Sequence, residues 1–155
     1  MGGSYYNRTS RVHTDGTLVY ETEEDHQQKL EVADYLERPW NCLFKDMGRL
    51  SPVDFVVNRH ERPSAVVEVK CRPHPLERYP TAWCNDRKYD WLLSWSAGLR
   101  VPGFFVLKFT DGVFWINVKD IPPDTRMGGC RKLVKSTTDI EPVHDIPLDL
   151  LHRVK

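Results

Sequence analysis

The sequence has no Cys-x-x-Cys pair, no long apolar run, no recognisable signal peptide and no excess charge of either sign. Its 22 Lys and Arg residues equal its 22 Asp and Glu residues in number. This balance argues against a protein that coats nucleic acid by bulk electrostatics, but it allows a local basic groove. The four cysteines (Cys42, Cys71, Cys84, Cys130) are scattered, as is typical of reduced thiols. We therefore expect a cytoplasmic protein that is neither secreted nor inserted in a membrane.

Length and composition fit one folded domain with a short leading segment. With 155 residues, of which 40% are hydrophobic, the chain is long enough to bury a sizeable core. Residues 1–20 are rich in Gly, Ser, Asn and Thr, so we predict a flexible N-terminal arm there. Residues 21–155 are predicted to form a single domain.

Apolar patterning predicts two helices and a series of strands. The capping pattern Thr22-Glu23-Glu24-Asp25 begins one helix, which Pro39 closes, and a second runs from residue 85 or 86 to Ala97, stopped by Gly98. Strands are predicted around residues 42–44, 52–57, 65–71, 103–109, 113–118, 131–135 and 141–144, with an irregular loop at 72–80 and a turn of helix at 148–152. This order predicts an α/β fold with a mixed central β-sheet flanked by helices.

Two of the predicted apolar strands carry charged residues, which are costly to bury without a partner. Asp54 interrupts the run Pro52–Val57, and Glu68 and Lys70 interrupt the run Ala65–Cys71. Because side chains alternate along a strand, Glu68 and Lys70 share a face, and a hairpin would bring Asp54 close to Glu68. Two carboxylates suit Mg²⁺ or Mn²⁺, and a neighbouring ammonium suits the hydrolysis of phosphodiesters.

This arrangement resembles the PD-(D/E)XK nuclease superfamily, and in particular its phage and prophage members. The motif stands as Pro52-Val53-Asp54 and then Glu68-Val69-Lys70, with one residue inserted between the Pro and the Asp. The order of helices and strands also matches. Further shared features are Arg72, the loop Tyr79-Pro80-Thr81, the helix residue Lys88, the hairpin Phe109–Trp115 and the pair Ile146-Pro147. The resemblance implies a restriction-endonuclease-like core.

The resemblance also implies a metal-dependent deoxyribonuclease that hydrolyses DNA with an activated water. Asp54, Glu68 and the Val69 carbonyl would hold the Mg²⁺ or Mn²⁺ ion. Lys70 would assist the attacking water, leaving a 5′-phosphate and a 3′-hydroxyl. The residues expected to bind the DNA backbone are Arg72, Arg78, Arg87 and Lys88. Such phosphate contacts carry no sequence information, so we expect structure-selective or weakly sequence-specific cutting.

A third carboxylate is expected from the first helix, where such proteins often supply one. The chain has Gln28-Lys29 at the expected position. Glu24 lies one turn earlier, on the line Glu24-Gln28-Val32-Leu36 of residues four apart. Glu24 is therefore our candidate for the third catalytic carboxylate.

Other interpretations of the same residues stay open. Glu68 and Lys70 can form an ion pair on a solvated face, and Cys71, His74 and Cys84 invite a zinc site that lacks a fourth ligand. A catalytically inactive member of the fold would bind DNA or serve as a phage structural or interaction component. A small hydrolase of nucleotides or RNA is a further alternative. A homodimer or a second phage protein is open as a partner.

Overall fold

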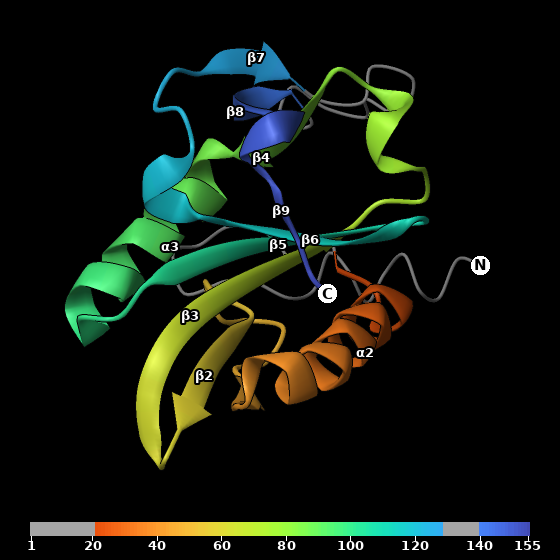
Figure 1. Ribbon diagram of the computed structural model, residues 1–155. Helices are drawn as coiled ribbons and strands as arrows, with labels where there is room; N and C mark the ends of the chain where they lie inside the picture. Colours follow the sequence, from red (N-terminus) through yellow and green to blue (C-terminus); the bar gives the residue numbers. More distant parts are fainter. Residues whose placement is uncertain (1–20, 129–139) are drawn as a thin grey trace.

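The computed structural model describes residues 21–128 and 140–155. Within these ranges, two long helices and two sheets make up the fold (Figure 1). The predicted arm 1–20 and the predicted strand 131–135 lie outside them. In chain order the elements are α2 (Glu23–Trp40), β1 (Leu43–Asp46), β2 (Phe55–Arg59), β3 (Arg62–Cys71), η1 (Leu76–Arg78), β4 (Thr81–Asn85), α3 (Asp86–Leu99), β5 (Gly103–Phe109), β6 (Gly112–Asn117), η2 (Val118–Asp120), β7 (Arg126–Gly128), β8 (Glu141–Pro147), η5 (Leu148–Leu150) and β9 (His152–Arg153).

The larger sheet is mixed, as predicted. Its strands lie in the order β1-β2-β3-β5-β6-β9. Strands β3 and β5 run parallel, with Val66 opposite Gly103, and the other neighbours pair antiparallel. A parallel pair needs a long crossover, and α3 lies in the connection between β3 and β5. Strands β4, β8 and β7 form a smaller antiparallel sheet.

Helices cover both faces of the larger sheet, which confirms the predicted fold class. In Figure 1, α2 lies on one face, and α3 lies on the other together with the smaller sheet. Side chains of β3 alternate between two buried clusters. Val66 packs in the cluster that contains Leu92 of α3, whereas Val67 and Val69 pack in the cluster that contains Leu36 of α2. Since the middle of β3 is buried on both faces, apolar residues there occupy consecutive positions instead of alternating ones.

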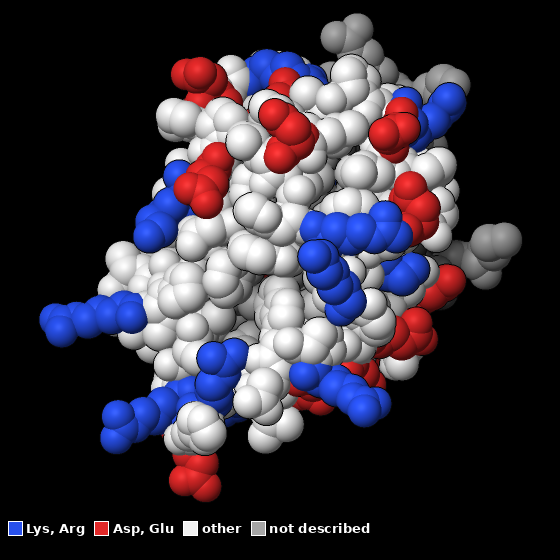
Figure 2. All heavy atoms as spheres, viewed as in Figure 1, with Lys and Arg blue, Asp and Glu red and all other residues white. Residues whose placement is uncertain are grey.

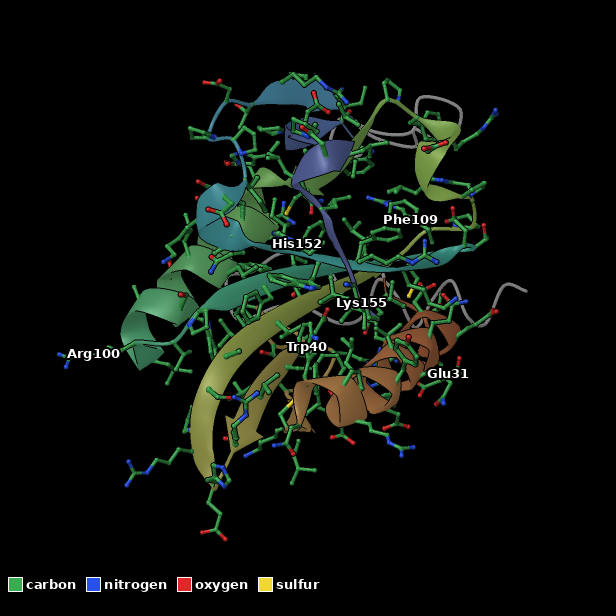
Figure 3. The ribbon with its side chains drawn as sticks, in the orientation of Figure 1. Glu31, Trp40, Arg100, Phe109, His152 and Lys155 are labelled. Carbon is green, nitrogen blue, oxygen red and sulfur yellow. The ribbon has the colours of Figure 1, made fainter. Side chains whose placement is uncertain are left out.

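The predicted start of the first helix is confirmed. Thr22 is the N-cap, and Thr22 and Asp25 exchange the two hydrogen bonds of a capping box. Pro39 lies inside the last turn, and the helix ends one residue later. Trp40 points from this end toward the sheet (Figure 3), and its ring lies 5.7 Å from Phe104 and 6.3 Å from Trp115 between centroids.

The structure differs from the prediction in several details. Strand β4 was not predicted, because Ala82, Trp83 and Cys84 are all apolar and hide an alternation in which only Ala82 and Cys84 are buried. The loop predicted at 72–80 contains the 3-10 turn η1. The turn of helix predicted at 148–152 is the 3-10 turn η5, followed by the short strand β9. The second helix also runs past Gly98 by one residue.

The surface agrees with the balanced composition. On the face seen in Figure 2, side chains of both charges are scattered around a broad uncharged area. Within the described ranges, no helix combines the length and the apolar character that crossing a membrane requires.

Leu92 provides a test of the core on the α3 side. Its side chain is fully buried, so Leu92→Ala is expected to lower the free energy of unfolding by about 3 kcal/mol. Leu43→Ala is the matched control, because Leu43 on β1 is 69% exposed and its loss should stay within about 0.5 kcal/mol. Urea unfolding measures both. Equal losses would contradict this assignment of the core.

Candidate active site

A cavity of about 330 Å³ opens where the starts of α2 and α3 face the end of β3. Asp54 and Lys70 line it from the sheet side, Lys29 from α2 and Lys88 from α3. The other described residues that line it are Glu21, Asp25, Gln28, Arg49, Ser51, Cys71, Asn85, Arg87 and Glu141. The lining is almost entirely polar or charged, which suits a charged ligand.

Asp54 lines this cavity, and Glu68 lies beside Asp54 without being among the described residues of the lining. The Asp54 backbone N–H donates to Glu68 Oε2 at 3.2 Å, and the Val69 N–H donates to Asp54 Oδ2 at 2.8 Å. The Asp54 backbone therefore holds the Glu68 side chain, and the Val69 backbone, next to Glu68, holds the Asp54 side chain. Asp54 directly precedes β2 instead of lying within it, and pairing of Phe55 with Val67 sets the register. The structure thus brings together the two carboxylates that the sequence singled out.

Two ammonium groups balance these carboxylates. Lys29 Nζ lies 3.0 Å from Asp54 Oδ1, and Lys88 Nζ lies 2.8 Å from Glu68 Oε1. The Asp54 side chain is 13% exposed and that of Glu68 only 5%, so water solvates neither charge well. Without the lysines, the fold would carry the cost of removing two like charges from water at adjacent positions.

The two carboxylates differ in the direction of their pKa shifts. Burial acts to raise the pKa of Asp54, but the charges of Lys29 and Lys88 and the Val69 hydrogen bond outweigh it and lower the pKa. Burial raises the pKa of Glu68, and the charge of Asp54 adds to this effect, which Lys88 only partly offsets. Asp54 is therefore the carboxylate that stays ionised, while Glu68 takes up a proton more readily.

Lys70 points to the same cavity from the strand that carries Glu68. The residue is exposed, yet the protein around it removes part of its hydration and lowers its pKa. The charges of Arg72, Lys29 and Lys88 lower the pKa further. An amine whose pKa is lowered exchanges a proton with a neighbouring oxygen more readily near neutral pH.

The basic residues predicted to bind DNA are not all at the cavity. Arg87 and Lys88 line it, and the Arg87 side chain is 45% exposed. Arg72 is half-buried, and its guanidinium lies 4.3 Å from the centroid of the Trp83 ring. Arg78 is exposed on η1 and is not among the described residues of the lining.

Glu21 takes the place near the site that we expected of Glu24. Glu24 is exposed on α2 and is not among the described residues that line the cavity; its catalytic role stays a prediction. Glu21 Oε1 lies 2.5 Å from Lys29 Nζ. Glu21 carries no signal of a site residue in the sequence, because it precedes the predicted helix. The pair Gln28-Lys29 lacks the expected carboxylate, but Lys29 at this position itself indicates an acidic partner.

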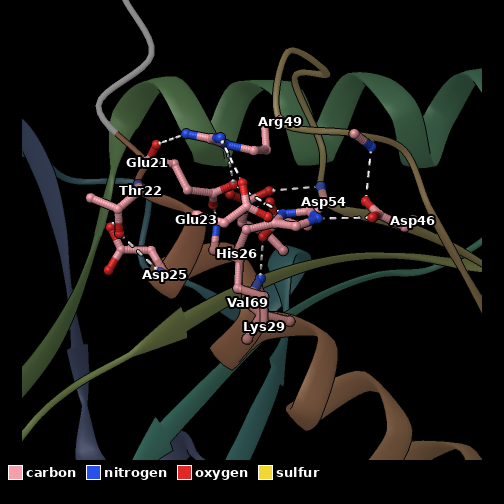
Figure 4. A network of polar contacts seen from close by, with 12 residues as sticks. Glu21, Thr22, Glu23, Asp25, His26, Lys29, Asp46, Arg49, Asp54 and Val69 are labelled. Carbon is pink, nitrogen blue, oxygen red and sulfur yellow. Dashed lines mark hydrogen bonds and ion pairs between the residues drawn. The ribbon is translucent and has the colours of Figure 1, made fainter. Parts of the chain in front are cut away.

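Polar contacts fix the start of α2 beside the site (Figure 4). Arg49 donates a hydrogen bond to the backbone carbonyl of Glu21. His26 lies between two carboxylates, 3.1 Å from Glu21 and 2.9 Å from Asp46. Arg49 and Asp46 belong to the segment that leads into Asp54, so these contacts tie the helix that carries Lys29 to the carboxylate it neutralises.

The fold and the carboxylate pair define a nuclease-like α/β protein. Residues 17–154 match the family described as "Phage putative PDDEXK endonuclease". The chain belongs to this family of PD-(D/E)XK nucleases. Among curated proteins, none matches the chain in sequence.

A solved structure shares the fold. Hjc, a Holliday junction resolvase from the archaeal hyperthermophile Archaeoglobus fulgidus, superimposes with a TM-score of 0.55. The match covers 82% of this chain and 90% of that chain, at 14% sequence identity. At this identity the likeness concerns the fold alone, which is restriction-endonuclease-like, as the resemblance in sequence implied.

The opposite pKa shifts predict opposite effects of neutral substitutions. Asp54→Asn removes a carboxylate whose charged form the fold favours, so it should lower the free energy of unfolding at pH 7. Glu68→Gln removes a charge that the fold disfavours, so it should raise this free energy or leave it unchanged. We expect a difference of about 1 kcal/mol or more between the variants in urea unfolding. Equal losses, or a larger loss for Glu68→Gln, would contradict the shifts.

Proposed function

We propose that the protein is a divalent-metal-dependent deoxyribonuclease that hydrolyses phosphodiester bonds in DNA. The observation that carries this proposal is the buried pair Asp54 and Glu68, of which Asp54 lines a cavity together with Lys70, Arg87 and Lys88. Membership of a nuclease family supports the reaction class, and the likeness to a Holliday junction resolvase supports DNA as the substrate. The phage origin of the family supports action in the cytoplasm of a host cell.

The donor set fits Mg²⁺ or Mn²⁺. Asp54 and Glu68 supply hard carboxylate oxygens, and we assign the Val69 carbonyl as a third donor. In the part of the chain that the structure describes, no group of three or more His, Cys, Asp or Glu side chains is placed to hold a metal. Water and a substrate phosphate would therefore complete the coordination. A bound ion would polarise the phosphoryl oxygen and acidify a water.

The remaining residues of the cavity divide into two roles. Lys70 Nζ accepts or returns a proton at the attacking water, for which its lowered pKa suits it. Arg87 and Lys88 bind the phosphates on either side of the scissile bond, and Arg72 and Arg78 extend this contact along the backbone. These contacts select the shape of the DNA and not its sequence. Cutting is therefore structure-selective or weakly sequence-specific.

One observation favours a second candidate function. Lys29 and Lys88 already neutralise both carboxylates, so the site is charge-balanced as it stands. A catalytically inactive protein that binds DNA, or that serves as a phage structural or interaction component, would need no more than this. The two candidates differ in whether Asp54 and Glu68 take up Mn²⁺ and in whether DNA is cut.

The proposed catalytic residues predict a loss of cleavage. Asp54→Asn and Lys70→Met should each lower the rate of Mg²⁺-dependent DNA cleavage by about 100-fold or more, because one loses a metal ligand and the other the group that exchanges the proton. The assay follows single-turnover cleavage of labelled duplex, branched, flap and single-stranded DNA, with and without EDTA.

Lys119→Met is the matched control for this assay. Lys119 is exposed on η2, at the end of the sheet opposite the cavity, so its loss should leave the rate unchanged. Cleavage that survives in Asp54→Asn, or that is absent from the wild type on every substrate, would refute the assigned catalysis and favour the second candidate.

Arg87 is predicted to contact a DNA phosphate. In the Asp54→Asn background, which prevents cutting, Arg87→Met should weaken DNA binding and reduce the slope of log affinity against log salt concentration by about 1. Arg100→Met is the control, because Arg100 points into solvent at the far end of α3 (Figure 3). Fluorescence anisotropy at several salt concentrations measures the slopes. An unchanged slope in Arg87→Met would exclude the contact.

A further inference from the structure

Lys29 is held between two carboxylates, only one of which belongs to the proposed metal site. Its Nζ lies 2.5 Å from Glu21 Oε1 and 3.0 Å from Asp54 Oδ1, and its side chain is 13% exposed. Lys88 differs, because among the described residues its ammonium pairs with one carboxylate, that of Glu68, and its side chain is 26% exposed. Lys88 can turn toward water or a phosphate, whereas Lys29 is enclosed with its two partners.

Lys29 contacts one oxygen of Asp54, and the backbone of β3 contacts the other. Asp54 Oδ2 already accepts the hydrogen bond of the Val69 N–H at 2.8 Å. The Lys29 ammonium lies against the second oxygen, Oδ1, at 3.0 Å. A divalent cation on Asp54 and the Lys29 ammonium would sit within a few ångströms of each other, where two positive charges repel strongly. The two positive charges therefore compete for Asp54.

We propose that Lys29 is a positioning residue that occupies the place of the divalent cation on Asp54 and moves onto Glu21 when the cation binds. The proposal rests on the metal site of the proposed function. Lys29 keeps Asp54 ionised and fixed while no cation is present, and it weakens cation binding by competing for Asp54. The ammonium needs no new partner after displacement, because Glu21 already contacts it.

The surroundings of Glu21 support this holding role. Its side chain is 15% exposed, and His26 lies 3.1 Å from its Oε2. Arg49 donates to its backbone carbonyl. Glu21 is therefore fixed beside the cavity before any cation arrives, and a displaced Lys29 would stay in the cavity lining as a positive charge next to the substrate phosphate.

Calorimetric titration with Mn²⁺ tests the competition. Lys29→Gln keeps a hydrogen-bond donor between the two carboxylates but removes the charge, so it should bind Mn²⁺ about tenfold more tightly than the wild type. Lys29→Arg keeps the charge and should bind as weakly as the wild type. Lys119→Met removes a distant lysine and should change nothing. Unchanged or weaker binding in Lys29→Gln would overturn the proposal.

A double-mutant cycle separates the holding role of Glu21 from direct coordination. Glu21→Gln removes the second partner of Lys29, which strengthens its hold on Asp54, and should weaken Mn²⁺ binding several-fold. In the Lys29→Gln background, the same change should have no effect. A further loss in that background would show that Glu21 is itself a metal ligand and would overturn its assigned role.

The outcomes also separate this proposal from the proposed function. Metal-dependent cleavage by the wild type, with no gain in Mn²⁺ affinity on Lys29→Gln, would refute the competition between Lys29 and the cation. It would leave the proposed function unaffected. Tighter Mn²⁺ binding by Lys29→Gln, with no cleavage by any variant, would support the competition and refute the nuclease. If Lys29→Gln does not fold, Glu21→Gln serves instead, and unchanged Mn²⁺ affinity there overturns the proposal. No Mn²⁺ uptake by any protein would overturn both.

Discussion

Two carboxylates lie next to each other at low exposure, at the end of the strand that runs through the middle of the larger sheet. Burial of Asp54 and Glu68 is costly unless positive charge and hydrogen bonds compensate it. The fold meets this requirement from both faces, since α2 delivers Lys29, α3 delivers Lys88, and the backbone of β3 holds Asp54. A change in the charge of Asp54 or Glu68 therefore alters the ion pairs that connect both helices to the sheet.

The positive charges that stabilise the empty cavity would also oppose the binding of a metal ion. A charge-balanced cavity is stable when empty, but a divalent ion adds positive charge where two ammonium groups already lie. Binding of the proposed metal ion would therefore require the ion pairs to rearrange, and on the α2 side Glu21 already contacts Lys29. Sites that act on charged ligands commonly retain such conflicts, because relieving them would remove the groups that the ligand needs.

Much of this could be predicted from sequence because the signals are local. The capping box at Thr22, Asp54 just before β2 and the charges within β3 are visible in a few neighbouring residues. The partners of those charges cannot be recognised from neighbouring residues. Lys29 meets Asp54 only through the packing of α2 on the sheet, and Glu21 joins them from outside any predicted element. Strand β9 escaped prediction because two residues are too few to show a period.

The wide spacing of the cavity lining along the chain has a consequence for how the protein is made. Its walls come from segments between Glu21 and Glu141, and β3 pairs in parallel with β5 across the whole of α3. Contacts between such distant segments form slowly, because much chain entropy is lost before they add stability. A polypeptide still emerging from the ribosome therefore has no complete cavity until β8 is made, because Glu141 on β8 follows the other described residues of the lining in the chain.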